Sequence, residues 1–252
     1  MIDTTANLVI SKSNEVFLKI NTEPHIEYEL RDHFKFEVPN AKFMPQYRGR
    51  NWNGEIHLYD MRSKQIYVGL LDKIVQFCEN YGYSYKFEDN KFYGTPFEEN
   101  NNISLEGVKD YMHSICSHTP RKYQVEGVYG ALKHNRKLLI SPTASGKSLM
   151  IYSLVRYYVD RGEKILLVVP TTSLVEQMYK DFLDYGWDAD SYCHRIYSGK
   201  EKSNEDPVTI TTWQSVYKLE RSFFEDYSVI IGDEAHLFKS KSLIQIMTKL
   251  HH

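Results

Sequence analysis

The second half of the chain alternates short apolar runs with longer segments in which apolar residues have helical spacing. The apolar runs cover residues 137–140, 165–169, 208–211 and 229–231, and the helical segments cover 147–160 and 173–185. Strands that are buried on both faces read as continuous apolar runs, because neither face meets water. Their alternation with helices predicts a mostly parallel sheet that is covered by helices on both sides. In such a sheet, ligands bind beyond the carboxyl ends of the strands.

The first half of the chain combines helix and strand patterns at shorter intervals. They predict a hairpin from strands at 8–10 and 15–20, a helix at 23–34, a strand at 55–60, a helix at 69–81 and a strand at 83–87. Pro24 suits the first turn of its helix, where a backbone N–H would have no partner. Ile56 and Leu58 alternate with polar neighbours, which predicts a half-buried strand. These patterns indicate a small α+β domain.

A polar segment and a short helix separate the two halves. Residues 97–102 read Phe-Glu-Glu-Asn-Asn-Asn, which is typical of a loop, and residues 104–114 favour a helix. We therefore predict an N-terminal α+β domain at residues 1–113 and an α/β domain at residues 114–250. The final residues 251–252, both histidine, are interpreted as the remnant of a purification tag.

Composition narrows the class of protein. Hydrophobic residues make up 42% of the 252 residues and the net charge is −2, so a sizeable core can form and nucleic-acid binding would need a local basic patch. Three scattered cysteines fit a reducing, cytoplasmic setting. His113, Cys116 and His118 invite a zinc interpretation, but no second ligand pair at zinc-site spacing follows them. No apolar stretch reaches the roughly 18 residues of a membrane helix, and no secretion signal is evident.

The apolar run at 137–140 leads into a phosphate-loop pattern. The segment consists of Ser141, Pro142, Thr143, Ala144, Ser145, Gly146, Lys147 and Ser148. It matches the pattern G-x-x-x-x-G-K-[ST] at its last three positions, with serine in place of the first glycine. In such a loop, backbone N–H groups face the phosphates, the lysine binds the β- and γ-phosphates, and the serine hydroxyl can ligand Mg²⁺. The alternative is a polar loop that opens a helix with Ser145 as its N-cap, but the strand–loop–helix context favours the phosphate loop.

A pair of carboxylates follows the apolar run at 229–231. Residues 233–236 read Asp-Glu-Ala-His. We expect Asp233 to hold Mg²⁺, and Glu234 to orient and deprotonate the attacking water, and we place His236 in the same catalytic group. Two adjacent carboxylates alone would suit a solvated loop. Together with the phosphate loop upstream, they predict binding and hydrolysis of a nucleoside triphosphate.

The two motifs, in this order, resemble the first motor domain of a superfamily 2 helicase of the DExH type. Three further segments support the resemblance: Arg121 and Gln124 within an Arg-Lys-Tyr-Gln run, Pro170-Thr171-Thr172, and Thr211-Thr212. The first resembles the adenine-reading Q motif, which implies a preference for ATP. The second resembles motif Ia, and the third resembles a later DNA-contacting segment. Hydroxyls and amides at strand ends can hold phosphates without reading sequence, although a threonine there is often only a helix cap.

The resemblance implies an α/β fold, a RecA-like P-loop domain with a mostly parallel sheet, preceded by the small α+β domain. Within the family, the chain before its final histidines resembles the N-terminal part of a phage-encoded recombination and repair helicase. This implies ATP and Mg²⁺ as cofactors and branched or duplex DNA, or an RNA–DNA hybrid, as the partner. It also implies branch migration, fork regression and R-loop removal by a monomer in the host cytoplasm.

Two departures from the family pattern limit what the resemblance implies. Ser141 and Ala144 stand where many members have Ala or Gly, and Gly, respectively. The family's motif III and second motor domain are not in this sequence, so we expect the chain to bind Mg·ATP without unwinding DNA by itself. Two alternatives remain: a duplex-DNA translocase that does not separate strands, and a binding module whose affinity is switched by ATP.

A basic segment interrupts the otherwise acidic N-terminal domain. Residues 42–64 contain five basic and two acidic residues. Arg48, Arg50 and Trp52 are interleaved with glycines, which suits phosphate contact and stacking on bases. The alternative is a solvated hairpin with Trp52 buried in the core. We predict that this segment helps to load the protein onto duplex or branched DNA.

Overall fold

The structure is a computed structural model and describes residues 6–88, 100–142, 144–197, 205–234, 236 and 241–250. The chain divides into two compact units, Met1–Tyr93 and Gly94–His252. The predicted boundary after residue 113 falls inside helix α4 (Leu105–Ile115), whose buried Val108 and Met112 pack in a core of the second unit. The residues interpreted as a tag remnant lie outside the described part of the chain.

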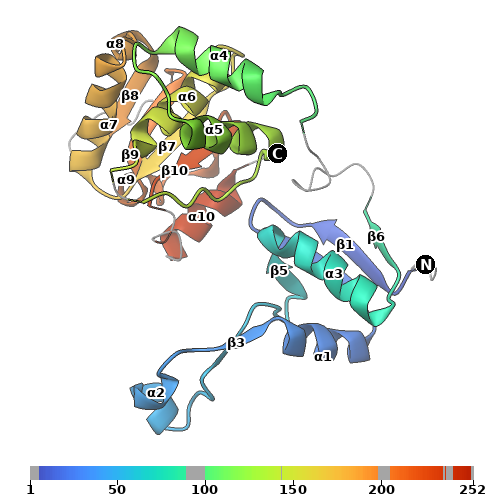
Figure 1. The fold of residues 1–252 in the computed structure, drawn as a ribbon. Coiled ribbons are helices and arrows are strands. Elements are labelled where there is room, and N and C mark those ends of the chain that lie inside the picture. Colours follow the sequence, from blue (N-terminus) through green and yellow to red (C-terminus); the bar gives the residue numbers. More distant parts are fainter. Residues whose placement is uncertain are drawn as a thin grey trace. The chain divides into compact units, whose positions relative to one another are not determined.

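A four-stranded sheet and two helices form the body of the first unit (Figure 1). Its elements are β1 (Leu8–Lys12), β2 (Phe17–Thr22), α1 (Pro24–His33), β5 (Gln65–Tyr67), the short turn η2 (Val68–Leu70), α3 (Leu71–Tyr81) and β6 (Tyr85–Phe87). The strand order is β5-β2-β1-β6, in which β1 pairs antiparallel with β2 and parallel with β6. Ile10, Ile20, Leu30 and Phe77 are fully buried in one core that joins the sheet to both helices. The predicted hairpin, helices and last strand are confirmed.

A second, two-stranded sheet carries an extension of this unit, here called the arm and defined as residues 35–57 (Figure 1). The arm consists of β3 (Lys35–Glu37), η1 (Ala41–Phe43), α2 (Pro45–Arg48) and β4 (Glu55–His57). The strand predicted at 55–60 is therefore shorter than expected, and Ile56 is 41% exposed instead of half-buried. Alternation in a sequence shows which side chains share a face of a strand, but it does not show whether another layer covers that face.

The second unit contains a four-stranded parallel sheet with the order β10-β7-β9-β8. Its strands are β7 (Ile165–Val169), β8 (Cys193–Ile196), β9 (Val208–Thr212) and β10 (Val229–Gly232). Three of them confirm the predicted apolar runs. The sequence pattern does not predict β8, because the Cys-His-Arg-Ile run is neither continuously apolar nor long enough to show a clear alternation.

Helices cover both faces of this sheet (Figure 1). They are α5 (Lys122–His134), α6 (Lys147–Val159), α7 (Thr172–Asp184) and α10 (Lys241–Lys249), with the short turns α8 (Ala189–Tyr192), α9 (Trp213–Val216) and η3 (Arg221–Phe223). Ile165 and Leu167 of β7 pack with α6 and α7, whereas Leu166 and Val168 pack with α9 and α10. All four side chains are buried, which explains why β7 reads as a continuous apolar run. Among the described helices, none is long and apolar enough to cross a membrane.

The strand predicted at 137–140 is absent from the described structure. These residues are irregular, and Leu138 and Ile140 are 65% and 93% exposed. Helix α5 ends at Asn135, whose φ of 56° turns the chain out of the helix, and the run that follows pairs with none of the described strands. The prediction was wrong because a short run with three apolar residues gives a strand only when a neighbouring edge accepts its backbone hydrogen bonds.

Two buried cysteines, one in each unit, give a test of the packing of the core around them. Burial raises the pKa of the Cys78 thiol to about 11 and also raises the pKa of Cys193. Both side chains are therefore thiols, not reactive thiolates, at pH 8. We expect iodoacetamide at pH 8 to leave Cys78 and Cys193 unmodified in the native protein and to alkylate both in denaturant, as measured by peptide mass spectrometry. Rapid alkylation of either residue without denaturant would contradict the described packing.

Candidate nucleotide site

The phosphate loop owes its shape to backbone conformations that most residues avoid. Gly146 has φ 77° and is the N-cap of α6, and Ala144 has φ 60°. A Cβ atom on Gly146 would lie 2.4 Å from Nε2 of Gln124, so glycine is required there by both conformation and space. Ser145 N donates to Pro142 O at 3.3 Å, and the hydroxyls of Ser145 and Ser141 are hydrogen-bonded. Thr143 lies outside the described residues.

The N-terminus of α5 holds this loop from one side. Gln124 is 5% exposed, and its Oε1 accepts a hydrogen bond from Arg121 N at 2.8 Å. Its Nε2 donates to Ser145 O at 3.1 Å and to Gly146 O at 3.2 Å. The amide that was predicted to face adenine is thus bonded to the phosphate loop through Nε2 and to the N-cap of its own helix through Oε1. Its contact with adenine stays a prediction.

The carboxylate motif follows the end of β10. Asp233 N donates to Val168 O at 3.0 Å, which continues the pairing of β10 with β7 by one residue. Glu234 has φ 53°, and its N donates to Asp233 Oδ1 at 2.9 Å. His236 is exposed, and its Nδ1 lies 3.3 Å from Glu234 Oε2.

An ion pair joins the phosphate loop to the carboxylate motif. Lys147 Nζ lies 3.1 Å from Glu234 Oε1, although the two residues are 87 positions apart in the chain. The two side chains are 33% and 36% exposed, so the pair is open to solvent and to a ligand. The two motifs that the sequence separates therefore form one site.

Oxygen donors suited to Mg²⁺ are present on both sides of this site. The Ser148 hydroxyl and the Asp233 carboxylate are hard oxygen ligands of the kind that Mg²⁺ prefers. No group of three or more His, Cys, Asp or Glu side chains gathers as a metal site within the described residues.

Two residues that the sequence analysis missed contact Ser148. Its Oγ lies 3.0 Å from the Tyr185 hydroxyl, and it hydrogen-bonds to the Asp181 carboxylate. Burial raises the pKa of Asp181, and the hydrogen bond from Ser148 opposes that shift. Both partners belong to α7 and its C-cap, 33 to 37 residues away, and no motif spacing marks them.

The two threonine segments meet at one edge of the sheet. Parallel pairing of β7 and β9 places Val169 opposite Thr212, and Gln214 Nε2 lies 3.5 Å from Pro170 O. Thr171 is exposed and caps α7 by accepting a hydrogen bond from Leu174 N at 3.3 Å, and Thr172 beside it is also exposed.

Thr211 and Thr212, in contrast, use their hydroxyls inside the protein. Thr211 is fully buried and donates to Ile196 O at 2.8 Å, and Thr212 is 3% exposed with its Oγ1 2.9 Å from Ser215 Oγ. These contacts favour a structural role for the two side chains. Their predicted contact with nucleic acid stays a prediction.

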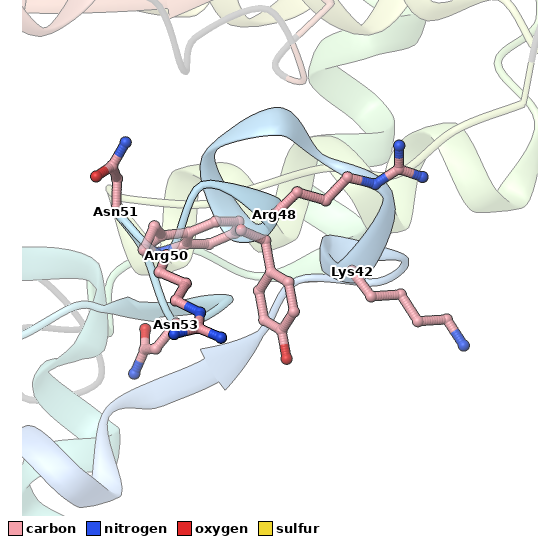
Figure 2. Close-up of a pocket in the computed structure, with 7 residues that line it drawn as sticks. Lys42, Arg48, Arg50, Asn51 and Asn53 are labelled. Atoms are coloured by element: carbon pink, nitrogen blue, oxygen red, sulfur yellow. The ribbon is translucent and has the colours of Figure 1, made fainter.

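The basic segment of the first unit forms an open hollow on the arm (Figure 2). It is lined by Lys42, Tyr47, Arg48, Arg50, Asn51, Trp52 and Asn53. Figure 2 shows Lys42, Arg48 and Arg50 extending away from the arm's backbone. Trp52 is half-buried, and its Nε1 donates to Glu55 O at 2.7 Å. It is not part of the described core of the unit, which disfavours the alternative of a core tryptophan, and its contact with nucleic acid stays a prediction.

Comparison with known proteins gives matches to both units. A family model described as type III restriction enzyme, res subunit, matches residues 117–252, and a model of the N-terminal part of the DNA helicase UvsW matches residues 11–88. The ATP-dependent DNA helicase uvsW of Enterobacteria phage T4 is 33% identical over 245 residues, which cover 93% of this chain and 47% of that relative. The chain thus spans about half the length of this relative.

Solved structures and a second relative extend the comparison. The crystal structure of the UvsW helicase from bacteriophage T4 matches with a TM-score of 0.79 and 32% identity, covering 97% of this chain and 88% of that chain. The DNA 3'-5' translocase XPB2 of Sulfurisphaera tokodaii is 31% identical over 133 residues, which cover 52% of this chain and 28% of that relative. One family model matches more than half of the chain, and the chain covers most of a solved UvsW structure at 32% identity. The chain therefore belongs to the superfamily 2 helicases, in the family of UvsW.

Proposed function

We propose that this chain binds Mg·ATP and forms the N-terminal part of an ATP-dependent DNA helicase. The observation that carries the proposal is the 3.1 Å contact between Lys147 and Glu234, which brings the phosphate loop and the carboxylate motif into one site. The helicase relatives support the ATP dependence, because the phage relative is described as an ATP-dependent DNA helicase.

In the proposed mechanism, an incoming triphosphate replaces Glu234 as the partner of Lys147. A pair in which each side chain is about a third exposed is worth at most about 1 kcal/mol. A triphosphate offers Lys147 several negative oxygens, so the exchange is favourable. Glu234 is then free to orient and deprotonate the attacking water, as a general base positioned in a phosphoryl-transfer site does.

The remaining residues of the site hold the phosphates and the metal. Backbone N–H groups around Gly146 and the N-terminus of α6 face the phosphate chain. Ser148 and Asp233 would hold Mg²⁺, which neutralises charge on the β- and γ-phosphates when it is bound. His236 contacts Glu234 at 3.3 Å and would restrain that carboxylate.

The DNA substrate is proposed from the phage relative. We place branched DNA first, with branch migration, fork regression and R-loop removal as the work of the whole helicase, and a monomer in the host cytoplasm as its working state. An RNA–DNA hybrid would be the substrate in R-loop removal. Unwinding is assigned to the whole protein, because the phage relative is about twice as long as the segment that matches it.

A second candidate is movement along duplex DNA without strand separation. The observation behind it is the match to a relative described as a DNA 3'-5' translocase, although the comparisons as a whole favour the helicase. A strand-displacement assay and a triplex-displacement assay on the whole protein separate the two candidates. A helicase displaces a base-paired strand, whereas a pure translocase displaces only the third strand of a triplex.

The first prediction from the proposed function concerns Lys147. Replacement by Ala removes the positive charge that meets the phosphates, so we expect the affinity for Mg·ATP to fall by at least about 100-fold, as for loss of a charged hydrogen-bonding partner. Isothermal titration calorimetry of this chain measures the change. Lys180→Ala, an exposed lysine of α7, serves as the control and should bind like the unchanged protein. Equal affinity in Lys147→Ala would refute the phosphate-loop assignment.

The second prediction concerns Glu234. Its replacement by Gln keeps the shape of the side chain and removes the base, so we expect Mg·ATP binding to persist and hydrolysis to slow by about 100-fold or more. Single-turnover hydrolysis of labelled ATP detects even slow chemistry. Glu225→Gln, at an exposed carboxylate of the same unit, is the matched control. Unchanged hydrolysis in Glu234→Gln would remove Glu234 from the role of general base.

The third prediction concerns the arm. Arg48 and Arg50 are exposed beside the half-buried Trp52, so they can meet a DNA backbone without rearrangement of a core. The double replacement Arg48→Ala/Arg50→Ala should weaken DNA binding and flatten the plot of log affinity against log salt by about two units, one for each lost phosphate contact. The double variant Arg31→Ala/Lys73→Ala removes two exposed basic residues of the same unit outside residues 42–64 and should leave the slope unchanged. An identical salt slope in both double variants would contradict DNA contact by the arm.

A further inference from the structure

We propose that Tyr123 is a positioning residue that fixes one peptide plane of the phosphate loop in the orientation that accepts phosphate. The inference rests on the proposed function of the site and adds a residue to which the sequence motifs gave no role. It concerns the peptide bond between Ser145 and Gly146.

The Tyr123 hydroxyl makes two hydrogen bonds at the edge of the loop. It donates to Ser145 O at 2.6 Å and accepts from Arg121 Nη1 at 3.1 Å. Because a guanidinium can only donate, the phenol's own proton is committed to Ser145 O. Gln124 Nε2 donates to the same carbonyl at 3.1 Å, so Ser145 O receives two hydrogen bonds from α5.

The direction of this carbonyl determines what the loop presents to a ligand. In a trans peptide, the C=O of one residue and the N–H of the next point in opposite directions. With Ser145 O directed to Tyr123 and Gln124, the N–H of Gly146 is directed away from α5. A peptide flip would present an electronegative carbonyl oxygen where a phosphate must bind. Tyr123 therefore helps to hold a donor, and not an acceptor, on the ligand side.

The loop needs such an external support. Gly146 has φ 77° and no side chain, so its flanking peptides can rotate more freely than those of other residues. Gln124 divides its amide between Ser145 O and Gly146 O, which leaves Tyr123 as a second, separate donor to the first of these carbonyls. Arg121, a predicted nucleotide-binding residue, is linked to the loop through the same phenol.

Tyr123→Phe tests the proposal, because it removes the hydroxyl and keeps a ring that is 42% exposed. The matched control is Tyr129→Phe on the same helix, a half-buried tyrosine whose hydroxyl has no hydrogen bond to the described part of the chain. We expect Tyr123→Phe to bind both Mg·ATP and Mg·tripolyphosphate about three- to tenfold more weakly in titration calorimetry, as for loss of one hydrogen bond. Tyr129→Phe should bind both ligands like the unchanged protein.

Hydrogen exchange gives a readout that needs no ligand. In the nucleotide-free protein, peptides that contain Ser145 and Gly146 should exchange about three- to tenfold faster in Tyr123→Phe than in Tyr129→Phe, with the same unfolding midpoint. Unchanged exchange at this segment would overturn the proposal.

The two ligands separate positioning from direct contact. Equal weakening of ATP and tripolyphosphate supports the proposal, because tripolyphosphate has no base or sugar. Weaker binding of ATP alone would mean that Tyr123 contacts the nucleoside. Unchanged affinity for both ligands would mean that the hydrogen bond of Tyr123 is dispensable. Either result overturns the inference and leaves the proposed function intact. Failure of the unchanged protein to bind either ligand would instead overturn the proposed function, and with it this inference.

Discussion

The parallel register of β10, β7 and β9 is the constraint on which the described site depends. It places Gly232 beside Val168 and Val169 beside Thr212, so the chain leaves three neighbouring strands at one edge of the sheet. The carboxylate motif and both threonine segments start from that edge. The register itself is held by β7, whose side chains pack into a different core on each face, so a slip by one residue would exchange the side chains of the two cores. Packing in the middle of the sheet therefore determines where the site residues at its edge lie.

Helix α5 supplies the second constraint, because it shapes the phosphate loop from outside the sheet. The buried Gln124 fills the space that a side chain on Gly146 would need. A glycine at that position is therefore required by a neighbour as well as by its own backbone. Motif residues that lie 22 positions apart in the chain consequently act as one packed unit, and a change in either one disturbs the other.

The sequence predicted the elements that depend on local residue patterns, and it did not predict the features that depend on contacts with distant segments of the chain. Continuous apolar runs identified β7, β9 and β10, and the spacing of glycine, lysine and serine identified the start of α6. The run at 137–140 has a similar pattern but pairs with none of the described strands. The mixed residues of β8 form a strand because they pair with β9. Long-range side-chain contacts were also beyond prediction. Tyr185 meets Ser148 only because two helices pack together, and the burial of Thr211 follows from its place between β7 and β8.

The left-handed backbone at Ala144 has a consequence for engineering the protein. An L-residue with a side chain loses about 1 to 2 kcal/mol in that conformation, whereas glycine does not. The loop thus contains conformational strain at a position whose side chain offers no polar group to a ligand. Exchange for glycine relieves that strain but also loosens the unfolded chain, and the two effects oppose each other. The sign of the change in stability on replacement of Ala144 by glycine therefore reports how firmly the rest of the molecule already imposes the shape of the loop.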